Sequence, residues 1–522
     1  MITPIALLAS GLLLHTPPTA TLHGAGKREV TEPVWVYFQD TRAEPTDASQ
    51  TVLTARALHR RSLRRSLPGL FDHLDVALDP RLAQDVASTG ATVRNESRWL
   101  HAVSANATPA QICALQELPG VLRVEPVRRG RAAWQDEEVD PIQHHSMLVP
   151  ADYGLSMDQL AQINLIKLHQ HGFTGAGMVI GVLDSGFHRI HQAFFSAEHP
   201  LQVIAEYDFV KHDPNTDIEA NDDPSQHNHG TMILGTMAGY MPDTYIGGAF
   251  EAQFVLCKTE DVPTETPVEE DNYVAGLEFI EQHGADLSTS SLGYIDWYLQ
   301  SDLDGATATT TVAVNIANAN GLVTLTAAGN MGHDADPGTS ELMAPGDAPL
   351  MLTCGSCRSN GQISSFSSDG PTADGRVKPE ILARGSATNT VDPNGTNTWV
   401  AASGTSLSTP LMAGAVACIL QARPDFTLAQ IRSALFATAS RSDSNGTLHP
   451  DPLFVEGYGI ANAFNAAAWG RPSADLNFDG HVDGTDLGLL LGNWGAGNVV
   501  GDLDNSGTVD GTDLGLLLGQ WQ

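Results

Sequence analysis

The sequence predicts an α/β protein whose main unit is a parallel β-sheet with helices on both faces. Short apolar segments such as MVIGVLD, FVLCK and LVTLTAAGN recur between about residues 155 and 468, and glycine or polar residues end each of them. A helix or loop is expected after each segment. Apolar strands that alternate with helices are typical of sheets buried on both faces, whose sites lie at the carboxyl ends of the strands. We expect the chemistry at that edge.

The chain is too long for a single hydrophobic core. Its 522 residues exceed the usual domain length of about 100 to 200 residues. Hydrophobic residues make up 42% and charged residues 17% of the sequence, which is ordinary for a folded protein. We expect an export signal at residues 1–25, a first unit at 33–130, the parallel-sheet unit at 155–468 and a tail unit at 473–522.

Charge and hydropathy exclude two classes of partner. The formal charge is −34, with 27 basic against 61 acidic residues, whereas nucleic-acid binding needs a surplus of basic side chains. Residues 5–14, IALLASGLLL, are followed by TPPTA; this segment resembles a secretory signal and is shorter than the roughly 20 residues of a membrane span. No later segment is expected to span a bilayer. The sequence therefore predicts a secreted or cell-surface-associated protein.

Residues 34–127 predict a small α+β layer with the ferredoxin-like order βαββαβ. Its second helix has a clear start: Thr108 as N-cap, Pro109 as first helical residue and Gln111 as the other half of a capping box. Five arginines interrupt the layer at Arg56, Arg60, Arg61, Arg64 and Arg65. They form either a solvated face or an electrostatic contact with the acidic unit that follows, and the sequence leaves both open.

Five cysteines do not indicate a disulfide framework. We interpret them as small buried hydrophobic residues, with a bond between Cys354 and Cys357 as the alternative. The five are Cys113, Cys257, Cys354, Cys357 and Cys418.

Three residues at strand-to-helix junctions suit nucleophilic catalysis. Asp184 ends MVIGVLD, His229 lies in HNHGTMILGTMAG, and Ser406 lies in GTSLSTPLMAG at the start of an apolar helix. Each alone could be a structural residue, such as a helix cap. Together, His229 would take the proton of Ser406 while Asp184 orients the imidazole. The chain order Asp184, His229, Ser406 differs from the order serine, aspartate, histidine of α/β-hydrolases. The G-x-S-x-G elbow of those enzymes is also absent here, because position 408 is serine.

The blocks VLDSG, HGTMILGTMAG, SLG, AAGN and GTSLSTPLMAG resemble the signature blocks of subtilisin-like (S8) serine peptidases. Further similar segments lie at 366–381, 423–435 and 457–468. The resemblance implies an endopeptidase that cleaves protein or peptide substrates through an acyl-enzyme. One departure is Met232, where the family usually has histidine, and we expect its side chain to pack inside.

The same resemblance implies further roles. Asn330 and the backbone N–H of Ser406 would stabilise the oxyanion. Ser291, Leu292 and Gly293 would pair with the substrate backbone as an added strand, and Ala327, Ala328 and Gly329 would form the opposite wall of the S1 pocket. The 33–130 unit resembles an inhibitory propeptide, so the chain's own propeptide is an expected inhibitor, removed by cleavage between about residues 128 and 155.

The tail contains two copies of one motif with a period of 27 residues. Each copy places oxygen ligands at EF-hand-like positions, with glycine at position 6, and predicts calcium as cofactor. The first loop comprises Asp475, Asn477, Asp479, His481 (by its backbone), Asp483 and Asp486; the second comprises Asp502, Asp504, Ser506, Thr508 (by its backbone), Asp510 and Asp513. Aspartate at position 12 followed by LGLLLGNWG resembles dockerin repeats, which implies a small α-helical calcium-binding domain and a cohesin-like docking protein as partner. A purely stabilising calcium module is the alternative.

Three questions stay open at this level. A non-catalytic scaffold and an acyl transferase that uses an amine acceptor would share most of the same motifs. The acidic insertion at 211–226 could bind calcium or favour basic substrates, although most acidic loops do neither. The depth of the S1 pocket depends on side chains that the motifs do not place.

Overall fold

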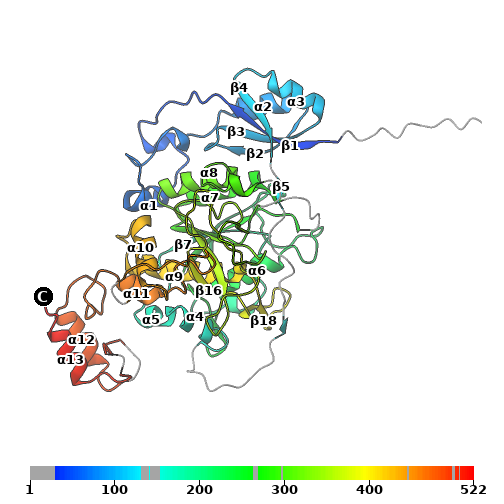
Figure 1. Ribbon diagram of the computed structural model, residues 1–522. Helices are drawn as coiled ribbons and strands as arrows, with labels where there is room; N and C mark the ends of the chain where they lie inside the picture. Colours follow the sequence, from blue (N-terminus) through cyan, green and yellow to red (C-terminus); the bar gives the residue numbers. More distant parts are fainter. Residues whose placement is uncertain are drawn as a thin grey trace, which may run out of the picture.

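The structure is a computed structural model that describes residues 30–127, 129–130, 140–141, 153–262, 268–294, 298–443, 446–496, 500–504 and 506–522. These residues form an N-terminal layer, a large central unit and a small C-terminal helical unit (Figure 1). The export signal expected at 1–25 lies outside the described residues, as does most of the segment expected to contain the maturation site.

The N-terminal layer has the predicted βαββαβ order. Its four strands form an antiparallel sheet in the order β2-β3-β1-β4. The elements are β1 (Glu32–Phe38), α2 (Pro80–Ser88), β2 (Thr92–Ser97), β3 (Ala102–Ala107), α3 (Pro109–Gln116) and β4 (Val121–Pro126). Successive side chains of β1 face opposite sides: Val34 and Val36 pack in the core of the layer, whereas Trp35 and Tyr37 pack with the central unit.

Helix α3 begins as the sequence predicts. The Thr108 backbone N–H donates to Oε1 of Gln111 at 2.8 Å, and the Gln111 backbone N–H donates to Oγ1 of Thr108 at 3.3 Å. This reciprocal pair is the expected capping box, and it satisfies donors that the first helical turn leaves free.

The central unit contains a seven-stranded parallel sheet in the order β16-β15-β14-β13-β7-β11-β8. Its strands are β7 (Val179–Asp184), β8 (Gln202–Asp208), β11 (Gln253–Lys258), β13 (Leu287–Ser290), β14 (Val323–Ala327), β15 (Leu352–Cys357) and β16 (Ile381–Arg384). Short pairs are β5 (Arg129–Gly130) with β12 (Val268–Glu269), and β9 (Tyr240–Met241) with β10 (Tyr245–Ile246). β17 (Thr388–Val391), β18 (Trp399–Ala402) and β6 (Asp140–Pro141) form a further sheet.

Helices cover both faces of the parallel sheet, which confirms the α/β prediction. On one face lie α4 (Met157–Gln162), α5 (Leu165–Gln170), α6 (Asn228–Ala238), α9 (Thr405–Ala422), α10 (Leu428–Thr438) and α11 (Ala463–Ala468). On the other lie α7 (Glu270–Gln282) and α8 (Thr309–Ala319). Met232 of α6 belongs to the first of these cores, as expected.

Helix α9 corrects the expectation that no later segment could span a bilayer. Its 18 residues have a mean hydropathy of 1.3, so length and composition alone would allow a crossing. The helix is 94% buried inside the structure, against the strands of the central sheet. This is the environment of a central core helix.

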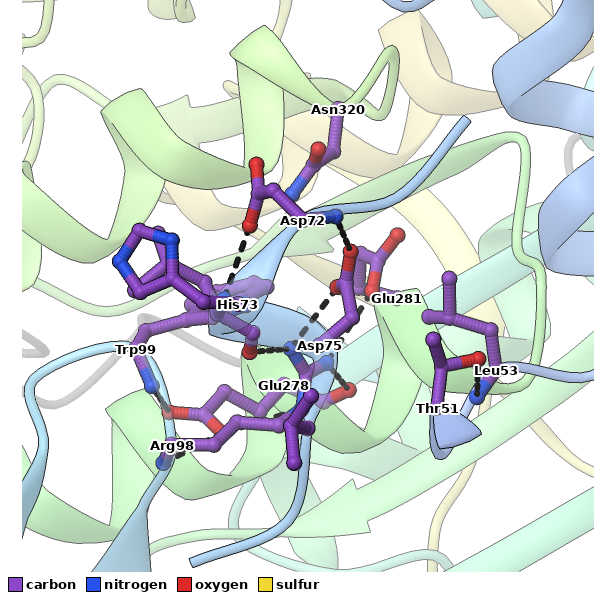
Figure 2. Close-up of polar contacts among 12 residues, drawn as sticks. Thr51, Leu53, Asp72, His73, Asp75, Arg98, Trp99, Glu278, Glu281 and Asn320 are labelled. Carbon is purple, nitrogen blue, oxygen red and sulfur yellow. Dashed lines mark hydrogen bonds and ion pairs between the residues drawn. The ribbon is translucent and has the colours of Figure 1, made fainter. Parts of the chain in front are cut away.

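The N-terminal layer lies against α7 and α8, as Figure 1 shows. Polar contacts from α7 support this packing: Oε1 of Glu278 accepts hydrogen bonds from Oγ of Ser97 at 2.5 Å and from the backbone N–H of Trp99 at 3.3 Å. Helix α1 (Ala55–Arg64), which carries four of the five arginines, contacts α7 where Arg61 donates a hydrogen bond to Glu281. Figure 2 shows Glu278 and Glu281 beside Asp75, Arg98 and Trp99 of the first layer.

The C-terminal unit is built from α12 (Gly484–Gly492) and α13 (Gly511–Leu518) around a small apolar core that includes Val482, Leu490 and Leu517. Phe478 leaves this unit and packs edge-on against Phe173 of the central unit, with ring centroids 5.2 Å apart. The tail is therefore joined to the central unit by an apolar contact.

The cysteine interpretation holds for four of the five residues. Cys257, Cys354, Cys357 and Cys418 are buried and free. Cys113 is exposed on α3, so burial was the wrong expectation for that position. Cys354 and Cys357 both lie in β15 and do not form a disulfide with each other.

Candidate active site

Asp184 lies at the carboxyl edge of the sheet, where the strand pattern placed it. It is the last residue of β7 and is fully buried. Gly230, which follows His229, leaves room for it, because a side-chain carbon at Gly230 would lie 2.9 Å from Oδ1 of Asp184. The same carbon would lie 2.2 Å from the backbone carbonyl oxygen of Gly186, so a larger residue at position 230 would displace the backbone after Asp184.

His229 faces this carboxylate from the first turn of α6. Its Nδ1 lies 2.7 Å from Oδ1 of Asp184, and its side chain is 2% exposed. An ionised carboxylate only accepts hydrogen bonds, so Nδ1 carries the hydrogen of this contact. The neutral imidazole then has its lone pair on Nε2, which is the tautomer that a general base requires.

Ser406 occupies the first turn of α9, directly after Gly404 and Thr405. The helix lies against β13 and β14, and the backbone carbonyl of Ser406 accepts a hydrogen bond from Oγ of Ser291 at 3.1 Å. Backbone N–H groups at the start of a helix have no partner within the helix and favour negative charge. Ser406 thus lies where an oxyanion would find backbone donors.

Asn330 is oriented by its neighbour Thr405. Its Oδ1 accepts from the backbone N–H of Thr405 at 2.8 Å and from Oγ1 of the same residue at 2.9 Å. A primary amide has one acceptor end and one donor end. With the acceptor end held by Thr405, the Nδ2 group is the end that is left to donate.

The two segments expected to bind substrate emerge side by side. Ser291–Gly293 follow β13, while Ala327 ends β14 and Ala328 and Gly329 follow it; β13 and β14 are paired parallel neighbours. Gly329 is tied to the serine helix, because its N–H donates to Oγ1 of Thr405 at 3.2 Å. The structure therefore brings both segments, Asn330 and the start of α9 to one edge.

Glu260 is a buried acid that sequence reasoning missed. It follows β11, the neighbour of β7, and is 2% exposed. Among the described residues neither of its carboxyl oxygens has a hydrogen-bond partner. Burial, strengthened by the charge of Asp184 and opposed by that of His229, raises the pKa of Glu260 well above its usual value. The sequence gives one signal for this residue: Glu260 is an acid two positions beyond the end of β11, the strand that pairs with β7.

Two lysines form ion pairs with acidic side chains in and beside the acidic insertion. Nζ of Lys258 lies 2.9 Å from Oδ2 of Asp208 and 3.2 Å from Oδ2 of Asp222, and Nζ of Lys211 lies 2.8 Å from Oε2 of Glu219. Three carboxylates here approach closely enough to share a cation: Asp208, Asp213 and Glu219. These ion pairs offset part of the negative charge of the segment.

The tail loops have the backbone shape that the sequence predicts. Gly480 and Gly507, at position 6, have φ of 96° and 88°. In the first loop Asp475 accepts from the backbone N–H of Gly480 at 2.8 Å, and in the second Asp502 accepts from that of Gly507 at 2.9 Å. The ligand oxygens of the second loop that lie within 4.8 Å of one another belong to Asp502, Asp504 and Asp513. An all-oxygen set of this kind fits Ca²⁺.

Known families match two parts of the chain. Residues 175–459, more than half of the sequence, match the subtilase family of peptidases. The chain belongs to the subtilase family. Residues 33–139 match the peptidase S8 propeptide domain of Bacteroidota. This subtilase is therefore a serine peptidase, a hydrolase, with an N-terminal propeptide domain, as the sequence predicted. The dockerin-like character of the tail stays a prediction.

Individual relatives agree with this assignment. Subtilisin E of Bacillus subtilis is 28% identical over 420 residues, which are 80% of this subtilase and 93% of that protein. A subtilisin of Bacillus pumilus is 30% identical over 316 residues, which are 60% and 98% of the two chains. Fervidolysin from Fervidobacterium pennivorans, a keratinolytic enzyme related to subtilisin, has a TM-score of 0.55 at 20% identity over 84% of this subtilase and 61% of its own chain. That likeness supports the fold.

Proposed function

We propose that this subtilase is an exported endopeptidase, made as a zymogen, in which Ser406 is the nucleophile, His229 the general base and Asp184 the orienting carboxylate. The observation that carries the proposal is the buried 2.7 Å contact between Nδ1 of His229 and Oδ1 of Asp184. It fixes the tautomer that leaves Nε2 basic at the same sheet edge as the start of α9. Serine needs such a base to become nucleophilic.

The reaction then follows acyl transfer chemistry. Oγ of Ser406 bonds to the peptide carbonyl carbon as its proton passes to Nε2 of His229. The carbonyl oxygen gains the negative charge and accepts hydrogen bonds from Nδ2 of Asn330 and the backbone N–H of Ser406. The C–N bond breaks as His229 returns the proton to the leaving amine. Water, activated by the same imidazole, then releases the acyl group and restores the serine.

Substrate would bind as an extended strand. Ser291, Leu292 and Gly293 leave the sheet edge next to Ala327, Ala328 and Gly329, so a peptide placed between the two segments can pair with the backbone. Strand addition of this kind takes its affinity from main-chain hydrogen bonds and its specificity from side-chain pockets. The scissile carbonyl would then lie at the start of α9.

The N-terminal domain, at 33–130, would act as the inhibitor of the mature enzyme. Trp35 and Tyr37 of its sheet, together with Trp99 of the turn after β2, pack in one core with α7 and α8. We infer that Ser406 cleaves the connection between about residues 128 and 155, after which the domain stays bound without a covalent link. Export by residues 1–25 would place the enzyme outside the cell or on its surface.

The tail at 473–522 would bind two calcium ions. Its glycine conformations and clustered carboxylates support this, and the motif resembles dockerins, so a cohesin-like protein is the partner we propose. The alternative is a module that only stabilises the chain. Captured protein after affinity purification on the wild-type tail, but not on one with both loops disabled, would favour docking.

One comparison tests the catalytic proposal. The full chain and its Ser406→Ala variant are expressed with calcium and compared for self-cleavage, casein hydrolysis and labelling by a fluorophosphonate. All three activities are expected in the wild type and none in the variant. Equal behaviour of the two, without label at Ser406, would show a non-catalytic scaffold. Products formed with an added amine distinguish acyl transfer from hydrolysis.

A further inference from the structure

Met343 fills the space between the two proposed walls of the S1 pocket. A side-chain carbon added at Gly293 would lie 2.5 Å from Cε, 2.8 Å from Cβ and 2.9 Å from Sδ of Met343. A carbon added at Gly329, in the opposite wall, would lie 2.7 Å from Cε of the same methionine. An added carbon at either glycine would therefore clash with Met343. The methionine side chain thus lies directly against the backbone of both glycines. Its residue is 2% exposed.

The backbone that carries Met343 is fixed to the first wall. The N–H of Tyr294 donates to the carbonyl of Ala344 at 2.8 Å, and the N–H of Ala344 donates to the carbonyl of Tyr294 at 3.2 Å. The carbonyl of Met343 accepts from the N–H of Gly346 at 2.7 Å. Met343 and Gly293 are the immediate neighbours of a two-way bridge, so the methionine cannot withdraw without breaking it.

The second wall is equally constrained. The backbone N–H of Ser368 donates to the carbonyl of Gly329 at 2.9 Å, and Oγ of Ser368 accepts from the N–H of Met331 at 3.0 Å. Gly329 has φ of 120°, which glycine adopts without strain. Both walls are therefore held from outside, and they cannot separate to make room for a large substrate side chain above Met343.

We propose that Met343 forms the floor of the S1 pocket and restricts the substrate residue before the scissile bond, P1, to small side chains such as alanine, glycine or serine. This inference rests on the proposed endopeptidase function and names its substrate class. Glycine at 293 and 329 accommodates the methionine, so the space that two glycines would otherwise open to the substrate is already taken. A flexible thioether can adjust, but here it is enclosed on both sides.

The expected size of the effect follows from pocket chemistry. A single extra methylene group in an apolar pocket changes specificity by about 10- to 200-fold. A phenylalanine at P1 exceeds alanine by a whole ring, so its exclusion should be at least as strong. The wild-type enzyme is expected to show kcat/KM at least tenfold higher for alanine than for phenylalanine at P1.

The test uses the mature enzyme obtained from the full chain and two substrates, succinyl-Ala-Ala-Pro-Ala-p-nitroanilide and its Phe counterpart. Met343→Gly is expected to raise the ratio of kcat/KM for the Phe substrate to kcat/KM for the Ala substrate at least tenfold. Met343→Ala, a second variant, should give an intermediate increase. Met351→Ala is the matched control, because Met351 is also buried but lies just before β15, at the opposite edge of the sheet.

The outcomes separate this inference from the function on which it rests. A wild type that hydrolyses both substrates equally, or Met343 variants with an unchanged Phe-to-Ala ratio and normal fluorophosphonate labelling, would overturn the role of Met343 alone. An equal change in Met351→Ala would overturn it too, because the effect would then be one of stability. A wild type that labels at Ser406 with neither substrate nor casein cleaved would overturn the endopeptidase function itself, and the inference with it.

Discussion

Arg61 of the propeptide donates from Nε to Oε1 of Glu281 on α7 at 2.8 Å, and neither side chain is exposed. Arg60 pairs with the same oxygen, and Arg98 donates to the other oxygen of Glu281 at 3.1 Å. Figure 2 shows Glu281 among the propeptide side chains Asp75 and Arg98. The arginine cluster is therefore an electrostatic contact with the protease, and the solvated-face alternative is wrong for Arg60 and Arg61.

Glu281→Gln should weaken retention of the cleaved propeptide. Removal of one partner from a buried ion pair costs about 3 to 5 kcal/mol, because the remaining charges stay buried without compensation. Since about 1.4 kcal/mol corresponds to a factor of ten, dissociation should accelerate about 100-fold or more. The measurement is the lag between self-cleavage and the appearance of casein hydrolysis in the full chain.

Glu117→Gln controls for a charge lost elsewhere, because Glu117 is exposed on the propeptide. Its lag should equal that of the wild type. A Glu281→Gln enzyme with an unchanged lag would mean that the buried network does not hold the propeptide.

The same network predicts resistance to mild acid. Burial alone would raise the pKa of Glu281, but Arg60, Arg61 and Arg98 outweigh burial and lower it from 4.5 to about 2. A carboxyl group whose pKa is lowered in the complex stabilises the complex at pH values above its ordinary pKa. This contribution is lost as the pH falls towards the lowered pKa. The processed complex, inactivated with fluorophosphonate, should elute intact by size exclusion from pH 7 to 5 and separate only below about pH 4. Separation at pH 6 would point to a different titrating group.

The elements of this fold were predictable where the signal is local. The Thr108–Gln111 capping box and the period-27 loops of the tail lie within short stretches of sequence, and the structure shows them as expected. The strand-to-helix position of Asp184 followed from one apolar run. These features depend on neighbours in sequence, which composition and spacing reveal directly.

The individual partners of most long-range contacts could not be predicted, although an electrostatic contact of the arginines with the acidic unit was one of the alternatives. Arg61 and Glu281 are separated by 220 positions, and no local pattern connects them. Met343 lies against Gly293 and Gly329 only because a loop returns to them. Glu260 shows the same limit, since its burial depends on elements that meet only in the folded chain. Only the tertiary arrangement supplies these contacts.

Asn330→Ala should reduce kcat and leave KM nearly unchanged. The Nδ2 group is aimed by the two hydrogen bonds from Thr405, and it gains a charged partner only as the oxyanion forms. Loss of one such donor costs about 100- to 1000-fold in kcat. Steady-state kinetics on the Ala-P1 substrate measure the effect. Asn360→Ala, at an exposed turn, should behave as wild type, and a mainly KM-based defect in Asn330→Ala would contradict the oxyanion role.

Glu341 should make the loop next to Met343 sensitive to pH. A hydrogen bond with Asp369, together with burial, raises the pKa of Glu341 from 4.5 to about 7. A raised pKa means that the folded state holds a proton that the unfolded state has released, so stability is full below about pH 4.5 and falls as pH rises through 7. Scanning calorimetry of the Ser406→Ala zymogen should show a Tm that decreases over this range.

Glu341→Gln in the same background should remove that part of the pH dependence, because the amide cannot ionise. Asp336→Asn changes an exposed carboxylate in the same loop and serves as the matched control. If the Glu341→Gln and Asp336→Asn proteins show identical pH profiles, the carboxyl pair does not control the stability of the loop.

If the tail binds two calcium ions as proposed, Asp502→Asn should remove one of them. The carboxylate of Asp502 lies close to those of Asp504 and Asp513 and also accepts from the backbone N–H groups of Ser506 and Gly507. Asparagine keeps an oxygen for the backbone contacts but loses the charge that Ca²⁺ prefers. The calcium stoichiometry of the tail, measured by isothermal titration calorimetry on the full Ser406→Ala chain, should therefore fall from two sites to one. The first loop serves as an internal control. An unchanged stoichiometry would show that the second loop is not a calcium site.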